Sequence, residues 1–134
     1  MRRVADLTPL VLVVDDDPDM LRVIRGVLED EGLAVTTAAD GGRALAVAAE
    51  RAPDLAVLDV GLPVLDGHQV ADGLRHLLGG AFPVLAITAD GHAAEKARHM
   101  RAYVGLRKPF ELNELVAQVW RGLGRTRQPA FDQL

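Results

Sequence analysis

The sequence predicts an α/β fold, a doubly wound parallel sheet of five strands with helices on both faces. Two observations predict this fold. Short apolar runs alternate five times with segments in which apolar residues recur at helical spacing. The runs are apolar at consecutive positions, which is typical of strands that are buried on both faces. The connections leave no room for an inserted domain, so a single layered unit is expected.

Each strand and helix has its own signal in the sequence. The strands are expected at residues 10–14, 33–37, 55–58, 84–87 and 103–106, and the helical stripes that follow them at 21–28, 44–49, 70–78, 91–101 and 112–119. Asp17 and Pro18 are typical of a helix start, because Asp caps the free N–H groups and Pro suits the first turn. Gly32 and Gly79 are typical of helix ends. Residues 125–134 form a polar C-terminal tail.

Composition excludes several classes of protein. Hydrophobic residues make up 49% and charged residues 25% of the 134 residues, the balance of a globular chain. Cysteine and serine are both absent, which excludes disulfides, cysteine metal sites and mechanisms with a thiol or serine nucleophile. The net charge of −4 lacks the basic footprint of a nucleic-acid binder. With no membrane-length apolar run and no signal-peptide core, we expect a cytoplasmic protein without membrane or direct nucleic-acid contact.

Polar side chains stand where four of the five strands end. Asp15 and Asp16 follow the first strand, Asp59 the third, Thr88 the fourth and Lys108 the fifth. Ligands bind beyond the carboxyl ends of parallel strands, so these groups are expected in one crevice. Two carboxylates ~4 Å apart repel by about 4 kcal/mol at an effective dielectric near 20, which favours a bound hard cation such as Mg²⁺. A metal, a lysine, a hydroxyl and a carboxylate together suit a phosphoryl group.

Five motifs in order carry a resemblance to a known family. They are VVDDDP (13–18), PDLAVLD (53–59), LPVLDG (62–67), ITA (87–89) and KPF (108–110). The set resembles the receiver domains of two-component response regulators in their single-domain form, over about residues 10–123. The resemblance implies a flavodoxin-like (βα)5 fold with strand order 2-1-3-4-5, and a receiver domain over residues 1–124.

The resemblance also implies a reaction and a metal site. Asp59 would be the phospho-acceptor, attacking a phosphohistidine on a sensor histidine kinase or a phosphotransfer protein. Asp15, Asp16, Asp59 and the backbone carbonyl of Gly61 would hold Mg²⁺, with Asp15 acting through water. The domain would catalyse only its own phosphorylation and dephosphorylation, so no other enzymatic activity is expected.

Signal output is the third implication of the resemblance. Thr88 would bind one phosphoryl oxygen and move inward on phosphorylation, and Lys108 would pair with another oxygen. The face formed by the fourth helix, fifth strand and fifth helix would then change its contacts with a downstream protein, an output domain or a second copy of the chain. The Lys108–Pro109 bond is cis in the family, which the physics permits because it precedes proline.

The sequence departs from the family pattern near the fifth strand. The family usually has an aromatic residue three positions before the lysine, where this chain has Gly105. Either Tyr103, two residues earlier on the same strand face, replaces it as a switch residue, or the aromatic part of the switch is missing. Gly61 and Asp90 stand at positions that tune hydrolysis of the acyl phosphate in the family, and their net effect stays open.

Two other functions fit parts of the sequence. Residues 13–17 also resemble the start of haloacid-dehalogenase-type phosphatases, with Asp15 as nucleophile and Asp17 as general acid. Asp19 departs from that pattern and Asp59 would have no role. A docking module of the same fold, without phosphorylation, is the second alternative. The cognate kinase, the phosphoryl lifetime, the oligomeric state and the choice between a stand-alone regulator and a piece of a longer one stay open.

The remaining polar residues have simpler interpretations. Asp17 and Asp66 are expected to be helix caps, and Asp54 a turn residue. Four histidines are scattered without zinc-site spacing, and solvated side chains are expected for them: His68, His76, His92 and His99.

Overall fold

The fold is the predicted doubly wound α/β sheet. The computed structural model describes residues 8–62, 65–89 and 91–124, without the side chain of residue 93, so the predicted tail lies outside the described residues. Five parallel strands are ordered β2-β1-β3-β4-β5, which confirms the expected order. In chain order the elements are β1 (Leu10–Val14), α1 (Pro18–Asp30), β2 (Ala34–Ala38), α2 (Gly41–Glu50), β3 (Leu55–Asp59), α3 (Gly67–Leu78), β4 (Val84–Thr88), α4 (Ala93–His99), β5 (Val104–Arg107) and α5 (Leu112–Gly122).

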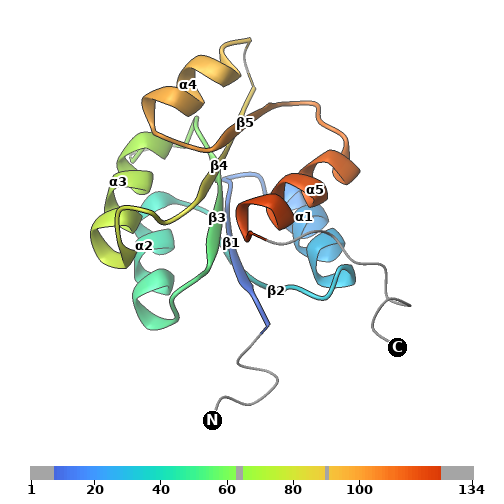
Figure 1. Ribbon diagram of the computed structural model, residues 1–134, viewed down its shortest axis with the longest axis horizontal. Coiled ribbons are helices and arrows are strands. Elements are labelled where there is room, and N and C mark those ends of the chain that lie inside the picture. The colour runs from blue at the N-terminus through green and yellow to red at the C-terminus, as the bar shows by residue number, and fades with distance from the viewer. Residues whose placement is uncertain (1–7, 63–64, 90, 125–134) are drawn as a thin grey trace.

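Helices cover both faces of the sheet. Figure 1 shows α2, α3 and α4 on one face and α1 and α5 on the other. Every residue of the central strands β1, β3 and β4 is buried, which explains their consecutive apolar residues. Successive side chains point to opposite faces, so Leu12 and Val14 join one core while Val11 and Val13 join the other. No helix among the described residues has the length and apolar character needed to span a bilayer.

Aspartates secure several connections in the fold. Asp17 caps α1 by accepting a hydrogen bond from the Asp19 N–H, and Asp66 caps α3, which confirms both predicted caps. Asp54 does more than the predicted turn residue. Its carboxylate accepts a hydrogen bond from the Leu10 N–H at 2.8 Å and so ties the chain before β3 to the start of β1. This additional contact has a physical reason: β1 and β3 are sheet neighbours, so their amino ends meet.

Gly67 lets α3 start directly against the loop that follows β3. Its N–H donates to the Val60 carbonyl at 3.1 Å. A Cβ at this position would lie 2.9 Å from the Val60 Cα and 3.1 Å from the Asp59 carbonyl oxygen. Both neighbours are backbone atoms, which cannot turn aside as a side chain can. The glycine therefore helps to hold the end of β3 in its observed position.

We expect Gly67→Ala to destabilise the domain and Gly26→Ala to stabilise it. The first substitution forces a backbone shift that costs about 1–3 kcal/mol. The second adds a methyl group inside α1 where no atom lies within 4 Å of the new Cβ, and gains about 0.5–1 kcal/mol of helix stability. Urea unfolding of both variants measures the free energies of unfolding. Equal stability of Gly67→Ala and wild type would show that the loop yields to the methyl group.

Candidate functional site

The carboxyl ends of four strands bring together the polar residues singled out in the sequence. Asp59 and Thr88 are the last residues of β3 and β4, Asp15 directly follows β1, and Lys108 directly follows β5. Backbone hydrogen bonds hold these ends in line, because the Lys108 N–H donates to the Thr88 carbonyl at 2.8 Å and the Val60 N–H to the Ile87 carbonyl at 2.8 Å. Residues that lie far apart in the sequence therefore share one crevice.

Three aspartates form an acidic cluster in this crevice. Carboxylate oxygens of Asp15, Asp16 and Asp59 lie within 4.8 Å of one another. Asp15 is 1% exposed and Asp59 is 8% exposed, while Asp16 faces solvent. Oxygen donors at this spacing fit a hard divalent cation such as Mg²⁺, which prefers carboxylate ligands and keeps several waters. The exposed side at Asp16 leaves room for those waters.

Lys108 contacts both buried carboxylates. Its ammonium Nζ lies 3.2 Å from Asp15 Oδ2 and 3.6 Å from Asp59 Oδ2. Burial acts to lower the pKa of Lys108, but the hydrogen bond and charge of Asp15, together with Asp59, outweigh burial and raise this pKa above its usual value of 10.5. Lys108 therefore carries a full positive charge at neutral pH. The Lys108–Pro109 peptide bond that orients the following chain is cis, as the resemblance implied.

Backbone N–H groups orient the two buried carboxylates. The Gly61 N–H donates to Asp59 Oδ1 at 3.0 Å, and the Asp17 N–H donates to Asp15 Oδ1 at 2.9 Å. Each carboxylate thus has one oxygen bound to the backbone and one facing Lys108. Gly61 is exposed, and the nearest atom to a Cβ placed there is Asp59 Oδ1 at 3.8 Å, so the approach to Asp59 from this side is open.

Not every residue singled out in the sequence joins the cluster. Thr88 is 3% exposed and lies at the crevice, at the end of β4. Tyr103 precedes β5 and pairs with Val84 at the opposite end of β4, and its hydroxyl donates to the Gln118 carbonyl at 2.7 Å. Its role as a switch residue stays a prediction. Asp90 lies outside the described residues.

Two features were missed in the sequence. Arg75 is buried and donates two hydrogen bonds to the backbone that follows α4. Its helical spacing from the buried Ala71 was the available signal. The rings of His68 and His99 lie 4.8 Å apart between α3 and α4, so the prediction of scattered histidines is wrong for this pair. The sequence separation of 31 residues gave no signal, since only helix packing brings them together.

The fold and site define a doubly wound α/β domain with an acidic cluster and a lysine at its strand ends. The family model of the response regulator receiver domain matches residues 11–120. The chain belongs to this family, whose members are signalling domains and generally bind Mg²⁺ at an aspartate cluster. The match supports a phospho-signalling switch over the phosphatase and docking alternatives.

Relatives and solved structures agree with the family assignment. The chain is 37% identical over 123 residues to the transcriptional regulatory protein KdpE of Mycobacterium tuberculosis, covering 90% of this chain and 54% of that protein. It is 42% identical over 114 residues to PrrA of the same species, covering 84% and 48%. The chain therefore spans about half the length of these curated relatives. Among structures, the receiver domain of NtrX from Brucella abortus superposes with a TM-score of 0.79 at 36% identity, covering 85% of this chain and 98% of that one. The chemotaxis protein CheY4 of Vibrio cholerae gives 0.78 at 30% identity, with the same two coverages.

We expect Asp59→Asn to stabilise the domain in a metal-chelating buffer. The substitution removes one of three clustered negative charges that a single lysine does not balance, and a gain of about 1 kcal/mol is expected for charges at this spacing. Thermal unfolding followed by circular dichroism measures the change. Asp30→Asn, an exposed charge change at the end of α1, is the matched control and should stay within about 0.5 kcal/mol of wild type. A lower melting temperature for Asp59→Asn than for wild type would contradict dominant repulsion.

Proposed function

We propose that this receiver domain accepts a phosphoryl group on Asp59 from a phosphohistidine of a sensor histidine kinase or phosphotransfer protein. The observation that carries the proposal is that Asp59 lies 3.6 Å from the Lys108 ammonium and within 4.8 Å of the carboxylates of Asp15 and Asp16. One buried carboxylate in a crevice open to solvent, next to a cation, is the group best placed to attack phosphorus. A receiver domain with such a partner would act in the cytoplasm.

The chemistry is a transfer between two nucleophiles. A carboxylate oxygen of Asp59 attacks phosphorus, the P–N bond to the histidine breaks, and the departing imidazole nitrogen keeps the electron pair. Negative charge spreads over the phosphoryl oxygens during the transfer, so cationic and hydrogen-bonding groups lower the barrier. Lys108 supplies the ammonium for one oxygen and Thr88 the hydroxyl for another.

Asp15, Asp16 and Asp59, with the Gly61 carbonyl, are the residues that would hold Mg²⁺. The donor set fits the ion, because it offers hard oxygen ligands around an excess of negative charge. A bound Mg²⁺ supplies positive charge that offsets the repulsion between the carboxylates and an incoming phosphoryl group. Lys108 balances the part of this charge that lies on Asp15 and Asp59.

The surroundings of Asp15 disfavour its use as a nucleophile. It is 1% exposed, one of its oxygens is bound to the Asp17 N–H, and the other faces Lys108 at 3.2 Å. Asp59 is reached more easily, on the side where Gly61 has no side chain. The same opening admits water, and water attack on the aspartyl phosphate returns the domain to its starting state.

The output of the switch would run through the α4–β5–α5 face. Thr88 and Lys108 are joined through the Thr88 carbonyl, so movement of Thr88 toward a phosphoryl group is passed to the end of β5. A downstream protein, an output domain outside this chain, or a second copy forming a homodimer would respond to the altered face. Tyr103, which packs between β5 and α5, would take part through its bond to the Gln118 carbonyl.

Intact-mass measurement tests the proposal. Wild type incubated with acetyl phosphate and Mg²⁺ is expected to gain the mass of one phosphoryl group, and to gain much less without Mg²⁺. Asp59→Asn is expected to gain none, because the amide is not a nucleophile toward phosphorus, while the control Asp30→Asn behaves as wild type.

Two outcomes would contradict the proposal. A wild type that never gains a phosphoryl group under these conditions would favour the docking module. Loss of uptake in Asp15→Asn together with full, unchanged uptake in Asp59→Asn would move the nucleophile to Asp15.

A further inference from the structure

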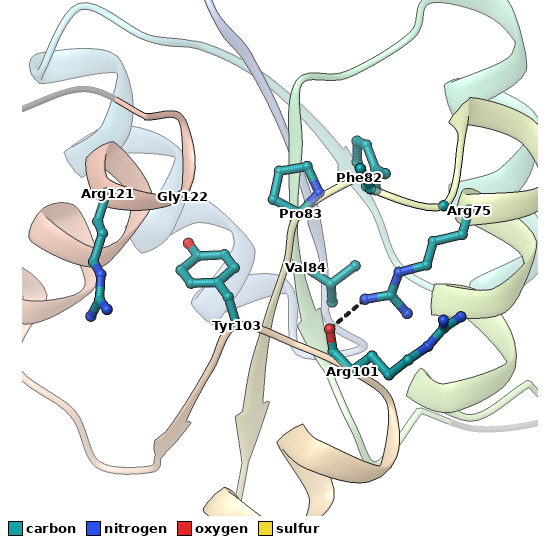
Figure 2. Close-up of a pocket in the computed structure, with 10 residues that line it drawn as sticks. Arg75, Phe82, Pro83, Val84, Arg101, Tyr103, Arg121 and Gly122 are labelled. Atoms are coloured by element: carbon teal, nitrogen blue, oxygen red, sulfur yellow. Dashed lines mark hydrogen bonds between the residues drawn. The ribbon is translucent and has the colours of Figure 1, made fainter.

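A second cavity lies at the opposite end of the sheet from the acidic cluster. It has a volume of about 360 Å³ and opens beside the first residue of β4 and the residue before β5. Three arginines and no carboxylate occur among the ten residues that line it. Figure 2 shows Arg75 and Arg101 on one side of Tyr103 and Arg121 on the other. The volume lies in the range of about 300–1,000 Å³ that is usual for small-molecule sites.

Arg75 is a fixed positive charge in this cavity. Its side chain is buried, and the guanidinium donates to the Met100 carbonyl at 2.6 Å and to the Arg101 carbonyl at 2.7 Å. Burial and the nearby charge of Arg101 lower the pKa of Arg75 from its usual value, with Asp72 opposing the shift. The two arginines therefore repel each other, and an anion between them would relieve the repulsion.

Arg101 occupies a backbone position that normally favours glycine. Its φ angle is 55°, in the left-handed region, just after the end of α4. Strained residues of this kind persist at functional sites more often than elsewhere. Neither Arg101 nor Arg121 forms an ion pair within the part of the chain that the structure describes. The chain as a whole is acidic, with a net charge of −4, so this gathering of unpaired cations is local.

The remaining wall of the cavity is apolar. Phe82, Pro83 and the ring of Tyr103 line it between the arginines (Figure 2). Guanidinium groups bind phosphate oxygens through pairs of parallel hydrogen bonds. This geometry fits a phosphate better than the single point charge of a lysine ammonium does. A flat ring attached to that phosphate would have the apolar wall to pack against.

We propose that this cavity binds a small phosphorylated compound with a flat ring, of mononucleotide type. Arg101 holds its phosphate in the fixed positive field of the neighbouring Arg75, and the ring packs on Pro83 and Tyr103, with Arg121 on the far side of the Tyr103 ring. This binding site is separate from Asp59, because the two lie at opposite ends of β4. Arg75 links the site to the backbone after α4, so occupancy would also stiffen this connection.

Calorimetric titration with adenosine monophosphate tests the inference. The buffer contains a chelator, so that phosphate cannot bind through a metal at the aspartate cluster. Wild type and Asp59→Asn are expected to bind equally, which separates this test from the proposed phosphorylation. Arg101→Gly is expected to weaken binding by about tenfold, as the loss of charge-assisted hydrogen bonds to the phosphate implies. Arg121→Gln, on the far side of Tyr103, is expected to weaken binding less. Arg43→Gln, an exposed arginine on α2, should bind as wild type.

A separate measurement checks whether Arg101→Gly loses affinity only because it is less stable. Glycine suits a φ of 55°, so Arg101→Gly is expected to melt no lower than wild type in the absence of ligand. Adenosine, which lacks the phosphate, and inorganic pyrophosphate, which lacks the ring, are expected to bind more weakly than the nucleotide. Wild-type affinity in Arg101→Gly, or no binding of the nucleotide by wild type, would overturn the proposal. Equal affinity for pyrophosphate would overturn the role of the apolar wall.

Discussion

The rest of the structure depends on the charge balance at the carboxyl end of the sheet. Three aspartates lie within 4.8 Å of one another there, and two of them are buried. Such an arrangement is unfavourable by itself, because carboxylates with little access to water repel strongly. Lys108 offsets part of the repulsion through its contacts with Asp15 and Asp59, and backbone N–H groups offset another part. The negative charge that is left over would favour the binding of a divalent cation.

The sheet places the three carboxylates at the carboxyl ends of its strands, where a ligand can reach them. Parallel strands bring their last residues to one edge of the sheet, and the helices on both faces bury the central strands behind that edge. Gly67 lets α3 pack closely against the backbone of Asp59 and Val60. The Asp59 carboxylate is therefore fixed both by its own backbone position and by the hydrogen bond that it accepts from the Gly61 N–H. A rigid support of this kind makes small movements at Thr88 or Lys108 transmissible to β5.

The two ends of the sheet carry opposite charges. Aspartates gather at the carboxyl ends of β1 and β3, whereas arginines from α3, α5 and the segment after α4 surround the amino ends of β4 and β5. Arg75 connects the second region to the first through the chain that leads from α4 into β5 and on to Lys108. The segment from α4 through β5 to Lys108 therefore links the arginine region directly to the aspartate cluster.

The sequence by itself determined the fold class, the strand order through a family resemblance, and the residues of the acidic site. Strand ends are local features: Asp59 and Thr88 directly follow apolar runs, and Lys108 follows one after Arg107, so each can be recognised without any partner. The aspartate caps at Asp17 and Asp66 were predictable for the same reason, since a cap acts on its own helix. Only the tertiary structure decided the link from Asp54 to Leu10, the pairing of His68 with His99, and the cavity around Arg75. These contacts join elements that are distant in the chain, and their partners are set by how helices pack on a twisted sheet rather than by any periodicity in the sequence.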